Sequence, residues 1–291
     1  MLTILATAML LTAPVAQHTD SLRARVEARI ARVPGAIVGV SYLDLASGDS
    51  LHVNADTSFH AASTMKVPVM IEFFRQADRG ERSLDERMLL VNEFTSIVDG
   101  SPYSLTEGDD SDSLVYRRVG QRVPVLELLE RMIIRSSNLA TNALIETVDA
   151  RKANATAREL GARSMKVLRG VEDLKAYERG LNNTTTSRDL AALLRAIEQG
   201  RAASPANTRA MRDILLRQEH NGEIPAGLPA GTRVAHKTGF ITAILHDAAI
   251  VYPEGGTPYV LVVLTGGIRD RDVARELIRD LSRIVYERRH H

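Results

Sequence analysis

The chain contains no cysteine and no tryptophan, and each absence excludes a class of site. Without cysteine there can be no disulfide, no thiolate metal site and no thiol nucleophile. With only five Phe and seven Tyr, stacking platforms for single-stranded nucleic acid are not expected. Charge of one sign is not in excess either, since 37 basic residues balance 36 acidic ones and no basic block stands out. We therefore expect no nucleic-acid partner.

Patterns for metals and phosphates are also missing. His60, His220, His236 and His246 do not have the spacing of metal ligands. The acidic run at residues 107–112 lacks the glycine-bounded pattern of an EF-hand, so it is predicted to be a solvated loop. No phosphate-binding loop and no Gly-x-Ser-x-Gly pattern occurs. The sequence thus predicts no metal and no cofactor.

Long hydrophobic runs are absent except at residues 1–16, which are apolar and uncharged. This stretch is typical of the core of a signal peptide, with a cut after Ala16, although no basic residue precedes it and Pro14 is unfavourable near the cut. It is short for a membrane span. We expect a secreted or periplasmic protein without stable membrane insertion after cleavage; an uncleaved anchor is the alternative.

Periodicity predicts an α/β fold. An amphipathic helix at residues 20–32 precedes two strands, a helical block follows from about residue 61 to 200, and the β-rich pattern then returns. The expected strands are 36–45, 50–54, 232–238, 243–252 and 259–265, followed by a helix at 271–289. This order predicts a five-stranded antiparallel sheet built from both chain ends (17–60 with 205–291), an inserted all-helical domain (61–204), and an active site at their interface.

The first candidate for chemistry is the pair Ser63 and Lys66. Three residues apart on a helix, the two side chains share one face. A lysine that is desolvated, or crowded by a second cation, can be neutral and accept the serine proton. The pattern is common by chance, so its value depends on the motifs further along the chain.

Three more groups occur in order. Ser136-Ser137-Asn138 interrupts two helices, Glu172 lies in a polar irregular segment, and Lys237-Thr238-Gly239 ends a strand. Each alone would have an ordinary structural role, as a helix cap, a solvated acid or a strand end. Together, in this order and with His246-Asp247 on the next strand, they make the chain similar to the class A β-lactamase and penicillin-binding-protein superfamily of active-site serine hydrolases.

This resemblance implies a serine β-lactamase that needs no cofactor, with a β-lactam or a peptidoglycan stem-peptide analogue as its small-molecule partner and a monomer as its default state. The roles it implies are a nucleophile at Ser63 with Lys66 as candidate base, proton relay by Ser136 and deacylation by Glu172. Asn138 would bind the substrate amide. Lys237 would lower the pKa of Lys66 and, with Thr238, hold the substrate carboxylate; Gly239 would admit the substrate backbone, and the N–H of Phe240 would complete an oxyanion hole.

The sequence departs from the family pattern in three places. Ser137 stands where most class A enzymes have aspartate. The Glu-x-x-Leu-Asn pattern occurs at Glu178 rather than at Glu172, so Glu178 is the alternative deacylating base, and Glu172 is favoured by its distance from Ser136. The basic residue that many members place after the Lys-Thr-Gly strand is not evident, Thr242 being the nearest polar side chain.

Two other functions remain open from the residues alone. A D-alanyl-D-alanine peptidase of penicillin-binding type needs no deacylating glutamate, so slow release of the acyl group would favour it. A silent cell-wall-binding domain would not react at Ser63 at all. The polar segment at residues 92–122 is predicted to be a surface excursion that overhangs the cleft and influences substrate range.

Overall fold

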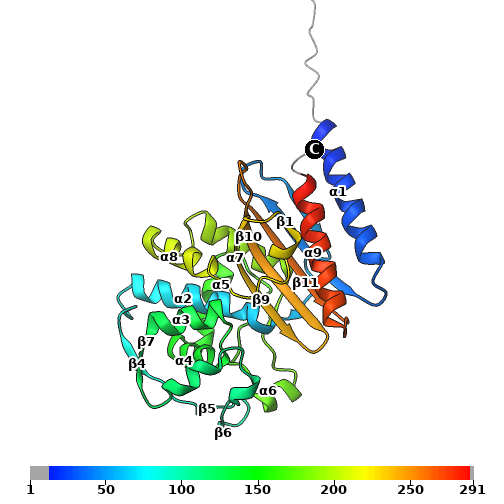
Figure 1. Ribbon diagram of the computed structural model, residues 1–291. Helices are drawn as coiled ribbons and strands as arrows, with labels where there is room; N and C mark the ends of the chain where they lie inside the picture. Colours follow the sequence, from blue (N-terminus) through cyan, green and yellow to red (C-terminus); the bar gives the residue numbers. More distant parts are fainter. Residues whose placement is uncertain (1–12, 289–291) are drawn as a thin grey trace, which may run out of the picture.

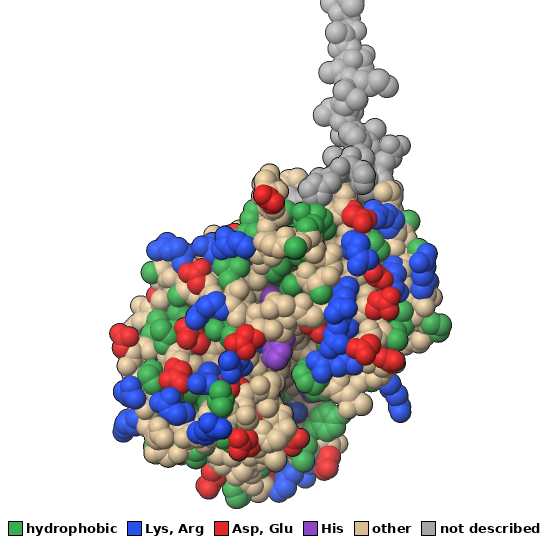
Figure 2. Space-filling view, viewed as in Figure 1, with side chains coloured by type: hydrophobic (Ala, Val, Ile, Leu, Met, Phe, Trp, Pro, Cys, Tyr) green, Lys and Arg blue, Asp and Glu red, His purple; other side chains and the backbone are tan. Residues whose placement is uncertain are grey.

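The structure, a computed structural model, describes residues 13–288. The first twelve residues of the predicted signal peptide lie outside this part. The predicted N-terminal helix is present as α1 (Ala13–Ala31). Within the described residues, no helix has the length and apolar character needed to cross a membrane. Basic and acidic side chains intermingle over the face seen in Figure 2, in keeping with a net charge of +1.

The core of the fold is an antiparallel five-stranded sheet whose strand order is β2-β1-β11-β10-β9. Its strands are β1 (Ile37–Asp44), β2 (Ser50–Val53), β9 (Arg233–Ile241), β10 (Ile244–Tyr252) and β11 (Tyr259–Gly266). The first two strands come from the N-terminal part of the chain and the last three from the C-terminal part, and β1 pairs with β11 along its whole length. The predicted fold class is thereby confirmed.

The two faces of the sheet bury two separate cores because side chains alternate along a strand. On β11, Leu261 and Val263 join the core beneath α1 and α9 (Arg271–Glu287). Their neighbours Val260 and Val262 join the larger core shared with the helical block. Both faces are therefore covered, and Figure 1 shows α1 and α9 on one side with α7 on the other.

The inserted segment is mainly helical but not all-helical as predicted, since short strand pairs interrupt it. Its helices are α2 (Lys66–Asp78), α3 (Val125–Ile134), α4 (Asn138–Val148), α5 (Ala150–Glu159), α6 (Leu174–Glu178) and α7 (Ser187–Glu198), followed by α8 (Pro205–Leu215). Short two-stranded sheets join β3 (Phe59–His60) to β8 (Thr184–Thr185), β4 (Arg87–Leu89) to β7 (Arg122–Pro124), and β5 (Phe94–Thr95) to β6 (Pro102–Tyr103). The 3₁₀ turns are η1 (Ala62–Met65), η2 (Glu107–Asp109), η3 (Ser113–Arg118) and η4 (Pro225–Gly227).

The helix predicted to begin at Ser63 begins three residues later. Ser63 lies in the 3₁₀ turn η1, and α2 starts at Lys66 with Pro68 in its first turn, where no backbone N–H is needed for the helix. Turn η1 packs against β9 and β10 of the sheet. The nucleophile candidate therefore lies where the sheet meets the helical block.

Candidate active site

The turn that carries Ser63 is held against the end of β9. Ala62, just before it, has a φ of 46°, a left-handed conformation that is uncommon for a residue with a side chain. A Cβ placed on Gly239 would lie 3.0 Å from the backbone nitrogen of Ser63 and 3.1 Å from that of Thr64. Only glycine therefore permits this close approach, which brings β9 against the nucleophile turn.

Lys66 is fully buried beneath this turn. Its Nζ donates to the backbone oxygen of Ser136 at 2.7 Å, to the Oγ of Ser136 at 3.2 Å and to Oδ1 of Asn138 at 2.9 Å. Burial lowers the pKa of Lys66 to about 7, against the attraction of Asp110 and Glu172. A neutral amine is thus accessible near neutral pH. Ser63 and Lys66 form no hydrogen bond with each other among the described residues.

Ser136 lies between two buried lysines. Its Oγ accepts from Nζ of Lys237 at 2.9 Å as well as from Lys66. The pKa of Lys237 is lowered well below its usual value, first by burial and then by the positive charge of Lys66. The sequence had suggested that Lys237 lowers the pKa of Lys66, whereas burial is the main cause for both amines. Two cations around one hydroxyl repel each other, so full charge on both is disfavoured.

Asn138 joins this lysine cluster to Glu172. While its Oδ1 accepts from Lys66, its Nδ2 donates to Oε1 of Glu172 at 2.7 Å. Burial raises the pKa of Glu172, opposed by the hydrogen bond from Asn138. Glu178, the alternative from the sequence, is exposed at the end of α6. Of the two acids, Glu172 is the one that the structure places beside Ser63, with a φ of 60°.

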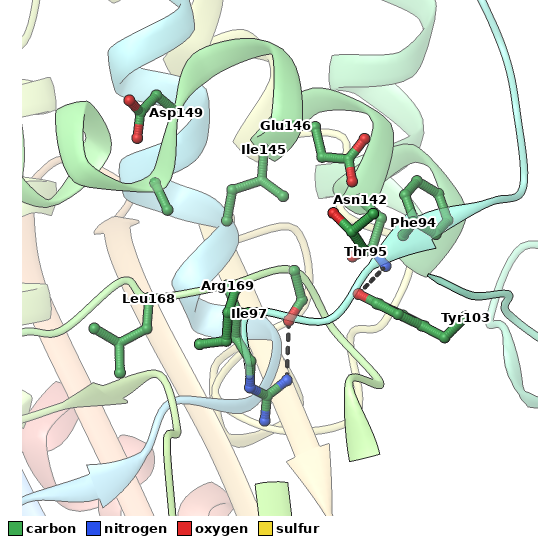
Figure 3. A pocket seen from close by; sticks show the side chains of 12 residues that line it. Phe94, Thr95, Ile97, Tyr103, Asn142, Ile145, Glu146, Asp149, Leu168 and Arg169 are labelled. Carbon is green, nitrogen blue, oxygen red and sulfur yellow. Dashed lines mark hydrogen bonds between the residues drawn. The ribbon is translucent and has the colours of Figure 1, made fainter. Parts of the chain in front are cut away.

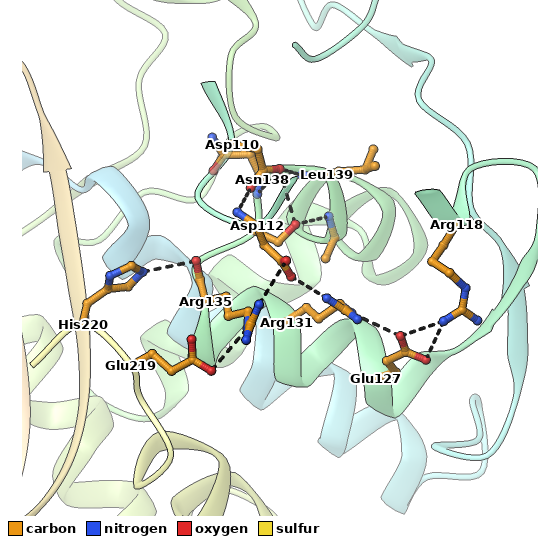
Figure 4. Close-up of polar contacts among 12 residues, drawn as sticks. Asp110, Asp112, Arg118, Glu127, Arg131, Arg135, Asn138, Leu139, Glu219 and His220 are labelled. Atoms are coloured by element: carbon orange, nitrogen blue, oxygen red, sulfur yellow. Dashed lines mark hydrogen bonds and ion pairs between the residues drawn. The ribbon is translucent and has the colours of Figure 1, made fainter. Parts of the chain in front are cut away.

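The acidic run at residues 107–112 is solvated as predicted at Glu107 and Asp109, but Asp110 and Asp112 turn inward. One carboxylate oxygen of Asp110 accepts the N–H groups of Asn138 and Leu139, each at 2.9 Å (Figure 4). These N–H groups belong to the N-terminus of α4 and need an acceptor, which an anion supplies best. Asp112 is buried and pairs with Arg131 at 2.8 Å (Figure 4).

Asp110 is the site residue that the sequence reasoning missed. The sequence feature that pointed to it was Ser137. Because the start of α4 has no carboxylate of its own, a carboxylate from another segment of the chain can accept its N–H groups. The predicted excursion therefore does reach the site, as a structural support of Asn138.

Glu172 is positioned by the loop of residues 169–183, called here the Glu172 loop. Asn142 of α4 accepts from the N–H of Val171 at 2.6 Å and donates to its carbonyl at 3.0 Å. Asp173 accepts from Ser96 at 2.8 Å and from the N–H of Ile97 at 2.9 Å. Four residues after Glu172 stands the buried Ala176, so this position offers no amide to hold a water molecule.

A cleft of about 310 Å³ opens beside Ser63. Its lining includes His60, Ser63, Asn138, Arg169, Glu172, Leu174, Tyr177, Phe240 and Thr242. Lys237 and Thr238 lie next to it on β9, where Lys237 also donates to the Thr238 carbonyl at 2.9 Å.

A basic side chain that the sequence did not reveal lies at the rim of the cleft. The guanidinium of Arg271, at the start of α9, stacks 3.9 Å from the centre of the Phe240 ring. Sheet packing brings it there from 31 positions further along the chain, which no local pattern could indicate. No group of three or more potential metal ligands occurs in the part of the chain that the structure describes.

A serine on a strained turn, two buried lysines and a glutamate joined through one asparagine, set between a sheet and a helical block, define an active-site serine hydrolase. The model of the beta-lactamase enzyme family matches residues 21–288, and the chain belongs to that family.

Similar proteins span most of the chain. A β-lactamase of Streptomyces albus G is 29% identical over 266 residues, covering 89% of this chain and 82% of that protein. The structure of PBP-A is 32% identical with a TM-score of 0.79, covering 93% of this chain and 96% of that one. A β-lactamase structure from Sphaerobacter thermophilus is 27% identical with a TM-score of 0.77, covering 92% and 96%. A variant of PBP-A is described as an acyl-enzyme complex with penicillin G.

Proposed function

We propose that this protein is a class A type serine β-lactamase that opens the β-lactam amide bond through an acyl-enzyme on Ser63. The observation that carries the proposal is the continuous hydrogen-bonded chain from Lys237 through Ser136, Lys66 and Asn138 to Glu172, beside the nucleophile turn. Relatives over most of the chain's length bear the name β-lactamase, which supports the same reaction.

In the acylation step, the Oγ of Ser63 attacks the lactam carbonyl and its proton passes to the neutral amine of Lys66. Lys66 contacts the Oγ of Ser136, so the proton has a path through that hydroxyl to the departing nitrogen. The backbone N–H groups of Ser63 and Phe240 stabilise the oxyanion of the tetrahedral intermediate, which collapses to the acyl-enzyme as the C–N bond breaks. Lys237 and Thr238 hold the substrate carboxylate.

In the deacylation step, Glu172 accepts a proton from a water molecule that attacks the ester carbonyl. The C–Oγ bond then breaks, and that proton returns to Oγ, which regenerates Ser63 and the ionised Glu172. The raised pKa of Glu172 makes it a better base near neutral pH than an exposed glutamate. Release requires Glu172 to be ionised, so it slows as the pH falls through this raised pKa.

A D-alanyl-D-alanine peptidase of penicillin-binding type is the second candidate, and one observation favours it. Ala176 replaces the amide that would help Glu172 hold water, so the acyl-enzyme would be released slowly.

We also propose that the enzyme works outside the cytoplasm, as a monomer. The apolar, uncharged residues 1–16 support export. Fractionation of cells producing the full chain, with the N-terminal residue of the mature protein determined, tests this: retention of Met1 in the cytoplasm would contradict it.

The function is tested by mixing the purified protein with benzylpenicillin and following intact mass over time. A transient adduct with turnover of the penicillin is expected. A long-lived adduct without turnover would favour the peptidase, and no adduct at all would favour a silent binding domain.

A further inference from the structure

Arg169, at the start of the Glu172 loop, is a buried cation without an anionic partner. It is only 6% exposed. Its guanidinium donates to the carbonyls of Leu181 and Gly170 and to Oδ1 of Asn182, each at 2.9 Å. These acceptors are all neutral, and no carboxylate forms an ion pair with Arg169 among residues 21–288. A buried charge of this kind is costly unless something pairs with it.

The carboxylates near Arg169 are occupied or lie on another side. Asp173 attracts the guanidinium from a distance, but its oxygens accept from Ser96, Ile97 and Ala176. Glu146 and Asp149 line a second cavity together with Arg169, but Figure 3 shows the guanidinium turned away from both carboxylates. Two of the five N–H groups of the guanidinium have no acceptor in the described structure.

Arg169 lines the same cleft as Ser63, together with His60. His60 Nδ1 accepts from the N–H of Ala62 at 3.1 Å, which leaves the ring proton on Nε2. This Nε2–H donates to no group among the described residues. Burial and then the positive charge of Arg169 lower the pKa of His60.

Arg169 and His60 add further hydrogen-bond donors to the cleft that Ser63 lines. The charges that act on Glu172 are those of Asp109, Asp110 and Lys66, and Arg169 is not among them. The largely exposed apolar side chains of Leu174 and Tyr177 line the same cleft and can pack against a substrate side chain.

We propose that Arg169 and His60 form a subsite for an anionic group on the acyl side chain of the substrate. The inference rests on the proposed function, because the acyl group must be attached at Ser63. A carboxylate would accept the two free N–H groups of the guanidinium and the Nε2–H of His60, and would supply the missing counter-charge. The enzyme therefore prefers β-lactams whose acyl side chain carries a carboxylate over the same compounds without it.

The decisive variant is Asn182→Asp. Asn182 lies outside the cleft lining and already accepts from Arg169, so a carboxylate of the same shape neutralises the guanidinium without removing a loop contact. The matched control is Asn154→Asp. The side chain of Asn154 accepts the backbone N–H of Val167 and forms no hydrogen bond with Arg169. Thermal unfolding of each variant monitors its folding.

The measurement compares the second-order rate constant of acylation for benzylpenicillin with that for its α-carboxylated analogue, carbenicillin. We expect the carbenicillin-to-benzylpenicillin ratio to fall about tenfold in Asn182→Asp, the effect of losing one charge-assisted contact, and to stay the same in Asn154→Asp. An unchanged ratio in Asn182→Asp would overturn the inference while leaving the function intact.

Two further outcomes are informative. Sodium sulfate that stabilises the wild type against heat but not Asn182→Asp, with no change in the acylation ratio, would mean that the site binds a free anion and would contradict the side-chain subsite. If neither penicillin acylates the wild type, the proposed function itself fails, and with it the substrate named here.

Discussion

The two ends of the reaction are built from different kinds of structure. The groups proposed for acylation lie on η1, at the start of α4 and on β9, and Lys66 and Lys237 are completely buried. The group proposed for release, Glu172, lies on a loop at a φ of 60° and is half-buried. Its position depends on the hydrogen bond that Asn138 donates to it and on those that Asn142 and Asp173 accept, rather than on packing of a regular element.

The difference teaches where this protein can change without losing its fold. Regular elements fix their side chains through a whole core, so a substitution near Lys66 disturbs buried packing. A loop held by a few hydrogen bonds can shift its acid while the nucleophile stays in place. Acylation and release should therefore respond separately to mutation.

The largest expected effect is on the nucleophile. Ser63→Ala should abolish the acyl adduct and lower turnover roughly 10⁶-fold, because no other group can form the covalent bond. Intact-mass measurement after addition of benzylpenicillin checks this, with the exposed Ser104→Ala as control. An adduct that persists in Ser63→Ala would place the nucleophile elsewhere.

Glu172→Gln should separate the rate of acylation from the rate of release most clearly. Acylation should continue, whereas release should slow about 10²- to 10⁴-fold because the base for water is lost. The lifetime of the adduct measures this directly. Glu178→Gln serves as the matched control and should change nothing; if it were the variant that accumulates adduct, the deacylating acid would be Glu178.

Gly170→Ala tests whether the hydrogen bonds between Asn142 and Val171 hold Glu172 in position. A Cβ at this position would overlap the side-chain amide of Asn142, which holds Val171. We expect release to slow roughly 10- to 100-fold by displacement of Glu172, with acylation retained. Gly108→Ala is the control, since its Cβ would meet no atom within 4 Å. Equal slowing of acylation and release would contradict the expectation that the two steps respond separately to mutation.

The smallest effect is expected at Asp110. Acylation in the wild type should rise with pH through about 7, because only the neutral amine of Lys66 accepts the serine proton. The charge of Asp110 raises the pKa of Lys66, so Asp110→Asn should move this limb to lower pH and destabilise the fold by roughly 1 kcal/mol.

The pH profile of the acylation rate, together with denaturant unfolding, measures both effects of Asp110→Asn. Glu107→Gln on the same segment is the control. A limb that moves to higher pH instead would show that the amine of Lys66 is not the group that titrates.

Much of the fold followed from periodicity. The β-rich runs became β1, β2, β9, β10 and β11 with ends within a few residues of those predicted, because two-sided burial requires continuous apolar strands. Helix α7 follows Thr186, whose side chain accepts from the N–H of Asp189 at 3.1 Å, as expected of a threonine at a helix start. Helix α2 began later than expected because the nucleophile turn is 3₁₀, a detail that periodicity does not resolve.

The site residues also fall into two groups, those that short motifs indicated and those that only the folded structure revealed. The order of Ser63, Lys66, Ser136 and Lys237 could be read directly, since each belongs to a short motif. Glu172 is favoured over Glu178 in the sequence by its distance from Ser136, and the fold separates the two acids, since Glu172 accepts from Asn138 and lines the cleft whereas Glu178 is exposed. The acidic run is solvated as expected at Glu107 and Asp109, whereas the N-terminus of α4 draws Asp110 inward, which the polarity of the run could not indicate.

The sequence by itself therefore determined the strand and helix pattern and the motifs that contain Ser63, Lys66 and Lys237, because local spacing and periodicity encode them. Only the tertiary structure decided the burial that lowers the pKa of Lys66 and which acid lies beside Ser63. It also brought Asp110, Arg169 and Arg271 around the cleft from three distant segments. Burial, counter-charge and close approach are properties of chain segments that meet only in the folded protein, so no local pattern can state them.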